Sequence, residues 1–429
     1  MESADVLIVG AGIAGLYSGV QLLRDRPGLK VVIVEKYKKL GGRVITFNGK
    51  EDTPAAGMHW ENGAGRIHKS HKRVRRLLRD HGLHLAPIGG ESGFIRGPGY
   101  GIEMNDFEDL IATYLAPLRL LGQETLGHNT LGKLLGEVHG SGEAARIIEK
   151  FPYYAEMWVQ RADMALEALC TDLGSRSGFG VCVEGLGSLI TALADTFRSM
   201  GGVIQEDCEM EQFERIGDEW IAEAFCGRKW ACGQLILAVH SSAISALKSS
   251  LASCGADVVL AAADRIRMER LLRIYAIYPE GSHVLTLPRL VVPGGLRYII
   301  PVNPGKGVVM ISYTEGKDTE PWWPAAIAAS AGDKKALKRL TRDLTAAVNE
   351  LFPGVKNPAP IFVKAHPWSS GCSYWLPGDY DPRELGRQVQ NPVPGLYVCG
   401  ESWSMHQAWM EGALESADEM LKAFTLHEE

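Results

Sequence analysis

The opening stretch of this chain constrains its fold more than any other. Residues 5–9 and 30–34 are short apolar runs, which are typical of buried parallel strands. Gly10, Gly12 and Gly15 lie between the runs, and residues 16–24 then have helical periodicity. The strand–helix–strand unit with the spacing G-x-G-x-x-G is the fingerprint of a dinucleotide site.

Each residue of this fingerprint has a physical role. Gly10 permits a tight turn, Gly12 lets the backbone approach a pyrophosphate, and Gly15 lets the helix pack on the strand. The helix N-terminus offers free N–H groups and the positive end of its dipole to the phosphates. Glu35 ends the second run, where a carboxylate accepts hydrogen bonds from ribose hydroxyls. The alternative is a glycine-rich turn in another α/β protein.

Length and charge limit the class of protein. A chain of 429 residues exceeds one ordinary core, so two or three domains are expected. The net charge is −6, which argues against a nucleic-acid partner. The one basic tract, residues 68–79, places Val74, Leu77 and Leu78 on one helical face and predicts an amphipathic surface helix. A nucleic-acid site on this tract is the alternative.

The cellular compartment is predicted from what the sequence lacks. The start has no charged region or cleavage signature of a signal peptide, and no apolar stretch is long enough to span a bilayer. The eight cysteines form no C-x-x-C pair. We therefore expect a cytoplasmic protein with reduced thiols, no membrane contact and no metal site. A homodimer is left open.

Two further glycine-containing segments are candidate ligand contacts. Gly41, Gly42 and Arg43 follow soon after Glu35, so the backbone can approach a ligand there and Arg43 can reach a phosphate. Residues 63–66, Gly-Ala-Gly-Arg, place Arg66 behind a turn of small residues, which suits bidentate capture of a carboxylate. An ordinary surface turn and a surface charge are the respective alternatives.

The remaining patterns predict alternating helices and strands. Residues 105–168 are mainly helical, and a helix begins at residue 188 and stops near residue 201. The further predicted strands are 203–204, 220–225, 230–239, 271–278, 296–301, 307–313 and 395–401, and the further predicted helices are 334–351 and 410–420.

These motifs together resemble the flavin-dependent amine oxidases, a family that includes monoamine, polyamine and L-amino acid oxidases. The resemblance rests on the first glycine fingerprint, Glu35, residues 41–43, Gly400-Glu401 and residues 409–413 (Trp-Met-Glu-Gly-Ala), and covers nearly the whole chain. It implies an α/β fold with a discontinuous Rossmann-type FAD-binding domain, a mixed-sheet substrate domain and a helical insertion. The expected ranges are 1–80, 178–240 and 366–429 for the FAD-binding domain, 81–177 for the helical and substrate region, and 241–365 for the substrate domain.

The resemblance also implies contacts with FAD. Gly63, Ala64, Gly400 and Glu401 match cofactor-binding positions, and the helix starting near Met410 would point its positive end at the flavin. Met210 matches the apolar position whose backbone meets the adenine, although a plain core methionine is the alternative.

Within the family, residues 63–66 look most like those of the L-amino acid oxidases, including bacterial tryptophan oxidases and snake venom enzymes. The resemblance implies that Arg66 binds the substrate carboxylate, that Tyr313 gives it a second hydrogen bond, and that Trp409 forms an aromatic wall. Core aromatics are the alternative for the last two.

Two positions raise separate questions. Arg273 aligns with a family lysine that holds a water near flavin N5, and arginine cannot give up its proton. The alternative is a shifted register with Arg273 on the surface. Cys372 resembles the cysteine through which monoamine oxidases attach their flavin, and its alternative is a small packing residue.

The predicted function is FAD-dependent oxidative deamination of an L-amino acid. The products would be an imino acid, hydrolysed to a 2-oxo acid and ammonia, and hydrogen peroxide from molecular oxygen. Trp368, Trp409 and Tyr313 favour a bulky or aromatic substrate. The alternatives are an amine or polyamine oxidase, an amino acid monooxygenase of the same fold, and a flavin-bound scaffold without turnover.

Overall fold

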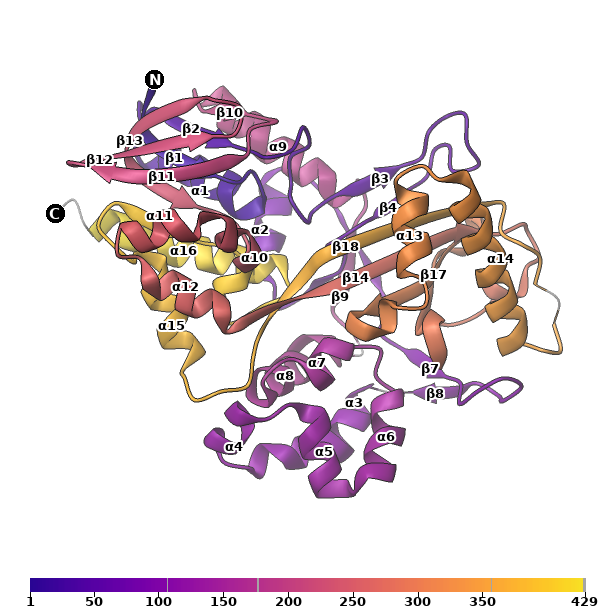
Figure 1. Ribbon diagram of the computed structural model, residues 1–429. Helices are drawn as coiled ribbons and strands as arrows, with labels where there is room; N and C mark the ends of the chain where they lie inside the picture. The colour runs from indigo at the N-terminus through magenta and orange to yellow at the C-terminus, as the bar shows by residue number, and fades with distance from the viewer. Residues whose placement is uncertain (106, 176, 356, 427–429) are drawn as a thin grey trace.

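The computed structural model describes residues 1–105, 107–175, 177–355 and 357–426 (Figure 1). Two seven-stranded sheets organise the chain, and a group of short helices lies beside the second sheet. Most of the candidate site residues come from loops and strand ends where these parts meet. The fold is therefore described here chiefly for how it brings distant segments together.

The first sheet is built around the N-terminal strand. Its path is β10-β2-β1-β13-β12-β11, with β19 pairing beside the end of β13. β1 is parallel to both β2 and β13, as a dinucleotide-binding sheet requires. The strands are β1 (Glu2–Val9), β2 (Val31–Val34), β10 (Val203–Gln205), β11 (Met210–Ile216), β12 (Glu219–Ala224), β13 (Lys229–Leu237) and β19 (Leu396–Val398).

Helices cover both faces of this sheet, which explains why its central segments, residues 6–9, 31–34 and 235–237, are apolar throughout. Val6 and Ile8 of β1 pack into one core cluster, whereas Leu7 and Val9 pack into another. The first cluster includes α1 (Ile13–Asp25), α2 (Lys72–Asp80), α9 (Leu186–Ser199) and α16 (Met410–Leu426); the second includes α10 (Ser241–Ile244), α11 (Lys248–Ser253), α12 (Asp257–Asp264) and α15 (Pro382–Gln390). The predicted amphipathic helix is α2, which buries its three apolar residues.

The second sheet is long and mixed, with the order β18-β14-β17-β16-β15-β7-β8. The extended pair β14–β18 forms one side of the sheet, and α13 (Trp323–Ser330) and α14 (Lys334–Leu351) cover one face (Figure 1). The strands are β7 (Ser92–Phe94), β8 (Glu103–Asn105), β14 (Ile266–Ile277), β15 (Leu290–Val291), β16 (Tyr298–Asn303), β17 (Val308–Glu315) and β18 (Phe362–Trp375).

The helical segment packs its own apolar cluster against the second sheet. This cluster includes Val291 and Tyr298 from the sheet. The helices are α3 (Phe107–Leu110), α4 (Gln123–His128), α5 (Leu131–His139), α6 (Ser141–Glu149), α7 (Tyr154–Trp158) and α8 (Ala162–Ala168). Two small sheets complete the fold: β3 (Thr46–Asn48) with β4 (His59–Glu61), and β5 (Ile67–His68) and β6 (Leu85–Ile88) on either side of β9 (Phe179–Cys182).

The predicted fold class is confirmed. The first sheet draws its strands from separated parts of the chain, and the helical segment is inserted between them. α14 begins and ends where predicted, whereas α16 continues past the predicted end at Met420. The domain boundaries given above remain a prediction. Within the described residues, no helix has both the length and the apolarity needed to cross a bilayer.

Candidate active site

The dinucleotide fingerprint has the geometry that its glycines predict. Gly10 has φ = 106°, and a Cβ atom there would lie 2.7 Å from the Ala238 carbonyl oxygen. A Cβ atom on Gly15 would lie 2.0 Å from the Gly10 carbonyl oxygen, so only glycine allows α1 to pack so closely. A Cβ atom on Gly12 would meet no atom within 4 Å. Gly12 thus faces open space at the start of α1, which fits a pyrophosphate.

Glu35 closes the other side of this turn. Its Oε2 accepts a hydrogen bond from the Ala11 backbone N–H at 2.8 Å, and its Oε1 accepts one from the Tyr37 N–H at 3.0 Å. The side chain is 6% exposed, and burial raises the pKa of its carboxyl group. Each oxygen keeps a further lone pair for a ribose hydroxyl. The Glu35 carbonyl oxygen accepts the Cys208 N–H at 2.8 Å, so the loop before β11 borders the same place.

Met210 lies two residues after Cys208, whose N–H donates to Glu35. Its side chain is buried in the core beneath the first sheet, and its backbone pairs with Ala224. The contact between the Met210 backbone and the adenine therefore stays a prediction.

A second glycine turn, at Gly41 and Gly42, packs against the first. The Gly41 N–H donates to the Ala11 carbonyl oxygen at 2.9 Å, and both Gly41 and Gly42 have positive φ. Arg43 follows, and its Nη1 lies 2.8 Å from Glu401 Oε2 and 3.2 Å from the Gly371 carbonyl oxygen. The structure thus joins two predicted cofactor residues in one ion pair. Their contacts with FAD remain predictions.

Glu401 is a buried junction between three segments. Besides Arg43, it accepts hydrogen bonds from the Ser373 N–H at 3.1 Å, the Ser373 hydroxyl at 2.8 Å and the Ala408 N–H at 2.6 Å. It thereby ties β18 and the segment before α16 to the second glycine turn. Gly400, with φ = 133°, and Met410, the first residue of α16, lie at the ends of this segment.

The loop of residues 63–66 is held against the cofactor residues. A Cβ atom on Gly63 would lie 2.1 Å from the Arg43 carbonyl oxygen, and the Ala64 N–H donates to that same oxygen at 3.0 Å. Trp368 lies across the loop and donates its indole N–H to the Asn62 carbonyl oxygen at 2.9 Å. The loop that carries Arg66 is therefore fixed next to Arg43.

Arg66 points into a ring of aromatic side chains. Both of its Nη atoms lie 3.4 Å from the Tyr153 hydroxyl, and its guanidinium lies 5.1 Å from the centre of the Phe179 ring. Among the described residues, no carboxylate forms an ion pair with Arg66, and the buried Glu156 interacts with it electrostatically. A second arginine, Arg289, interacts electrostatically with Arg66 and hydrogen-bonds Tyr298, and burial lowers its pKa. Two neighbouring buried cations are costly unless an anion meets them.

Tyr313 and Arg273 stand directly opposite each other on β17 and β14. The Arg273 guanidinium lies 5.6 Å from the centre of the Tyr313 ring, and its Nη1 donates to the Glu61 carbonyl oxygen at 3.3 Å. Arg273 is half-buried, so the alternative that placed it on the surface is wrong. A Cβ atom on Gly65 would lie 3.4 Å from its Nη1, so Arg273 also borders the loop that carries Arg66. Its chemical role stays a prediction.

Two buried carboxyl groups lie behind Tyr313, and sequence reasoning missed both. The Tyr313 hydroxyl donates to Glu315, whose other oxygen accepts the Ala155 N–H at 3.4 Å. The Tyr374 hydroxyl donates to Glu156 Oε1 at 3.4 Å, and Glu156 Oε2 is buried without a partner among the described residues. Both side chains are 4% exposed. Burial raises the pKa of Glu315 to about 7 and that of Glu156 well above its usual value.

A third residue that sequence reasoning missed is Phe179, which connects the predicted substrate residues. The Trp409 ring stacks 6.3 Å from Phe179, whose ring also lies over Arg66, and Trp409 contacts the His71 ring at 4.7 Å. Arg66, Phe179 and Trp409 therefore form one continuous wall. The only sequence signal for Phe179 was its position after Gly178 in a glycine-rich stretch.

Tyr313 and Cys372 interact electrostatically, so the two side chains lie near each other. Burial raises the pKa of both groups, yet both side chains keep some accessible surface. The raised pKa keeps the Cys372 thiol protonated, and its bond to flavin remains untested.

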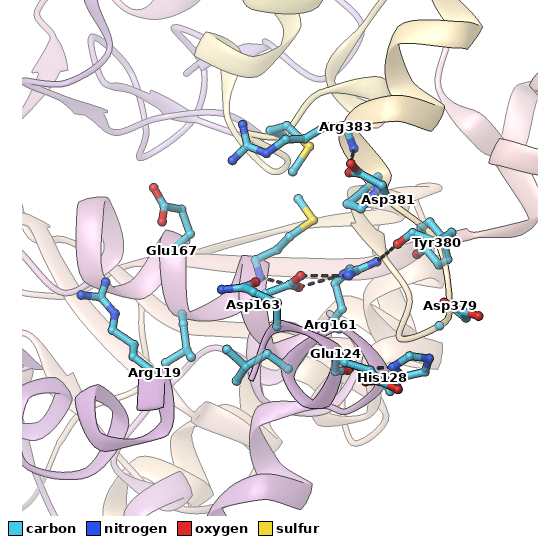
Figure 2. Close-up of a pocket in the computed structure, with 18 of the residues that line it drawn as sticks. Arg119, Glu124, His128, Arg161, Asp163, Glu167, Asp379, Tyr380, Asp381 and Arg383 are labelled. Atoms are coloured by element: carbon cyan, nitrogen blue, oxygen red, sulfur yellow. Dashed lines mark hydrogen bonds and ion pairs between the residues drawn. The ribbon is translucent and has the colours of Figure 1, made fainter. Parts of the chain in front are cut away.

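A separate polar cleft of about 1050 Å³ lies between α4, α8 and the segment leading into α15 (Figure 2). Arg161 lies inside it, paired with Asp163 at 2.8 Å and donating to the Tyr380 carbonyl oxygen at 2.9 Å. The lining carries both signs of charge and contains none of the predicted site residues. In the described ranges there is also no group of three metal-ligating side chains.

Comparison with known proteins identifies the class. Residues 13–419 match the model of the flavin containing amine oxidoreductase family. The chain belongs to this family, and its cofactor is FAD. The geometry around Gly12 and Glu35 fits that cofactor.

The individual relatives include both an L-amino-acid oxidase and amine oxidases. An L-amino-acid oxidase from Siganus canaliculatus is 23% identical over 97% of this chain and 84% of its own length. A putrescine oxidase structure has a TM-score of 0.74 at 15% identity, covering 100% of this chain and 99% of the other. Cyclohexylamine oxidase from Brevibacterium oxydans IH-35A has a TM-score of 0.75 at 19% identity, covering 99% of both chains. These structural likenesses show the shared fold.

Proposed function

We propose that the protein catalyses FAD-dependent oxidative deamination of an L-amino acid with a bulky or aromatic side chain. The observation that carries this proposal is Arg66, which faces an aromatic-lined site and, among the described residues, forms no ion pair with a carboxylate, although Glu156 interacts with it electrostatically. A substrate carboxylate would supply the missing anion. The similarity to an L-amino-acid oxidase over nearly the whole chain supports the same assignment.

The side chains of the site have separate tasks in this proposal. Arg66 binds the carboxylate, and Tyr313 gives a second hydrogen bond when its hydroxyl is released from Glu315. Phe179 and Trp409 form the wall along which an aromatic side chain packs. The chain thereby fixes the substrate Cα in one position, which is the main contribution of a protein to cofactor chemistry.

Several residues of the chain are suited to hold FAD. Gly10, Gly12 and Gly15 would border the pyrophosphate, Glu35 would accept hydrogen bonds from the ribose, and the start of α16 would offer its positive end to the flavin. Arg43, Gly42, Gly63, Ala64, Gly400 and Glu401 form a connected set around the second turn. Bound FAD supplies a two-electron acceptor for the substrate and passes the electrons to oxygen.

One observation favours a second candidate, an amine oxidase. Glu156 and Glu315 are buried carboxyl groups close to the site, and a cationic substrate without a carboxylate would be attracted to them. Both groups lie behind tyrosine hydroxyls, and Glu156 Oε2 is inaccessible. A substrate therefore meets the tyrosines before the carboxyl groups, which is why we place this candidate second.

The test mixes the FAD-loaded protein anaerobically with each common L-amino acid and with the amine that lacks only its carboxylate. We expect bleaching of the flavin by an aromatic amino acid and little by its amine. Bleaching by amines alone would establish the second candidate and remove the proposed role of Arg66. Preference for lysine or glutamate would contradict the aromatic assignment.

A second assay separates the oxidase from a monooxygenase. Under air, the oxidase gives a 2-oxo acid, ammonia and hydrogen peroxide, whereas a monooxygenase decarboxylates the amino acid to an amide. We expect one peroxide for each 2-oxo acid. An amide product without peroxide would show that the protein is a monooxygenase and not an oxidase.

A further inference from the structure

Two cysteines lie close together at the ribose end of the FAD site. The Sγ atoms of Cys208 and Cys226 are 3.1 Å apart. Cys208 precedes β11 and is 2% exposed, whereas Cys226 lies in the turn between β12 and β13 and is exposed. Both are free thiols in the structure. The pair therefore consists of one accessible and one protected sulfur.

The end of the β11–β12 pairing and the turn after β12 bring these two sulfurs together. Met210 pairs with Ala224, and the Phe225 N–H donates to the Glu209 carbonyl oxygen at 2.9 Å. Residues 224–227 then form a tight turn, in which the Gly227 N–H donates to the Ala224 carbonyl oxygen at 2.8 Å, and Cys226 in this turn lies beside Cys208. A disulfide needs the sulfurs to move together by only about 1 Å.

The two thiols differ in reactivity. The Arg228 backbone N–H and the Cys208 thiol both hydrogen-bond Cys226, and these contacts lower its pKa. Burial raises the pKa of the Cys208 thiol. An exposed thiol of lowered pKa beside a protected thiol is the arrangement in which one sulfur is oxidised and the other resolves it.

We propose that Cys226 and Cys208 form a peroxide-responsive thiol pair that closes to a disulfide beside the FAD ribose. The Cys226 thiolate attacks a peroxide oxygen, the O–O bond breaks, and the departing hydroxide is protonated to water. The resulting sulfenic acid is attacked by the Cys208 sulfur, the S–O bond breaks, and the second hydroxide takes the Cys208 proton. Two thiols are oxidised by two electrons, and peroxide is reduced to two waters.

The position of the pair gives the disulfide a consequence for the cofactor. The Cys208 N–H donates to the Glu35 carbonyl oxygen, and ion pairs Lys36–Glu209 and Lys38–Asp207 hold the same loop. Closing the disulfide would tie this loop to the β12–β13 turn. We therefore expect FAD to leave the oxidised protein severalfold more slowly than the reduced protein. Only the source of the peroxide rests on the proposed oxidase reaction, so added peroxide tests the thiol pair independently.

The test uses the FAD-loaded full chain, reduced, desalted and then exposed to hydrogen peroxide. After alkylation and non-reducing digestion, mass spectrometry should find the Cys208 and Cys226 peptides joined, with two hydrogens lost. Cys208→Ser should instead accumulate a sulfenic acid on Cys226 that dimedone traps, and Cys226→Ser should leave Cys208 reduced. Cys254→Ser, at a half-buried cysteine elsewhere, should keep the joined peptides.

Two measurements on the intact protein complete the test. If Cys208→Ser does not fold, Cys208→Ala replaces it. Peroxide should raise the Tm of the wild type by about 3 °C and leave that of Cys226→Ser unchanged. FAD release should slow in parallel. Oxidation of Cys226 without joining, or no oxidation of Cys226, would overturn the thiol pair. Joining with unchanged FAD release would overturn its link to the cofactor.

Discussion

The cofactor end and the substrate end of this site are built in different ways. The part of the cofactor end expected to hold the pyrophosphate and ribose consists mainly of backbone from one short stretch, in which three glycines and Glu35 take conformations that their spacing predicts. The substrate end consists of side chains from distant elements, including Arg66, Phe179 and Trp409. The first kind of site can be recognised from the sequence alone. The second needs the fold, because its members share no local pattern.

Substitution of the glycines should have the largest effect and separates cofactor binding from folding. A Cβ atom on Gly12 meets no atom of the protein, so Gly12→Ala should fold normally but lose most of its FAD. A Cβ atom on Gly15 would lie 2.0 Å from the Gly10 carbonyl oxygen, so Gly15→Ala should also lower the Tm. The flavin absorbance per protein and the Tm of each apoprotein measure the two effects.

A matched control comes from a glycine away from the site. Gly136 lies in α5 with open space around its Cβ position, so Gly136→Ala should keep full FAD binding and gain up to about 1 kcal/mol of stability. Equal FAD content in Gly12→Ala and the wild type would mean that the pyrophosphate lies elsewhere.

Glu315 should give the substrate end a pH dependence that the cofactor end does not share. Burial raises the pKa of Glu315 to about 7, so below that pH the group is neutral and can donate to the Tyr313 oxygen. The Tyr313 hydroxyl is then free to donate to the substrate. Above pH 7 the carboxylate takes that hydrogen bond and repels the substrate carboxylate. The KM for the amino acid should therefore rise about tenfold as pH increases through 7.

Glu315→Gln removes the titration while keeping the side-chain size. Its KM should show no step near pH 7, whereas Glu214→Gln on the exposed part of β11 should keep the wild-type step. Initial rates across pH 5.5–8.5 measure both. A step that persists in Glu315→Gln would assign the titration to another group.

The aromatic wall should have the smallest of the three effects. Phe179→Leu keeps an apolar side chain but removes the ring beneath the Arg66 guanidinium, 5.1 Å away. A cation–π contact of this kind contributes about 0.5–2 kcal/mol, so kcat/KM should fall about 2- to 30-fold with unchanged FAD content. An equal loss for Phe213→Leu, in the core beneath the first sheet, would point to general destabilisation instead.

Local patterns account for what the sequence predicted. The boundaries of α14 were predictable because Asp333 accepts hydrogen bonds from the Lys335 and Ala336 N–H groups, and Pro353 follows the helix. Gly15 was assigned because close packing of helix and strand allows no side chain. In both cases the residues that decide the structure lie within one or two turns of each other.

Long-range contacts account for what it missed. Glu156 meets Tyr374, and Phe179 meets both Arg66 and Trp409, across separations that no periodicity encodes. The Arg273 register was uncertain from the sequence because strand pairing decides which face a residue takes. Arg66 was predicted from its glycine turn and from the family resemblance, whereas Tyr313 and Trp409 were predicted from the resemblance alone. The structure shows the neighbours that surround all three.

The most direct test of carboxylate recognition compares two rates of anaerobic flavin reduction. One is the rate with an L-amino acid and the other is the rate with the amine that lacks only its carboxylate, each measured in the wild type and in Arg66→Ala. We predict that the wild type prefers the amino acid by at least about 100-fold, and that Arg66→Ala binds FAD but loses most of this preference. Arg79→Ala, at an exposed residue of α2, should keep it. An unchanged preference in Arg66→Ala would contradict carboxylate recognition by Arg66.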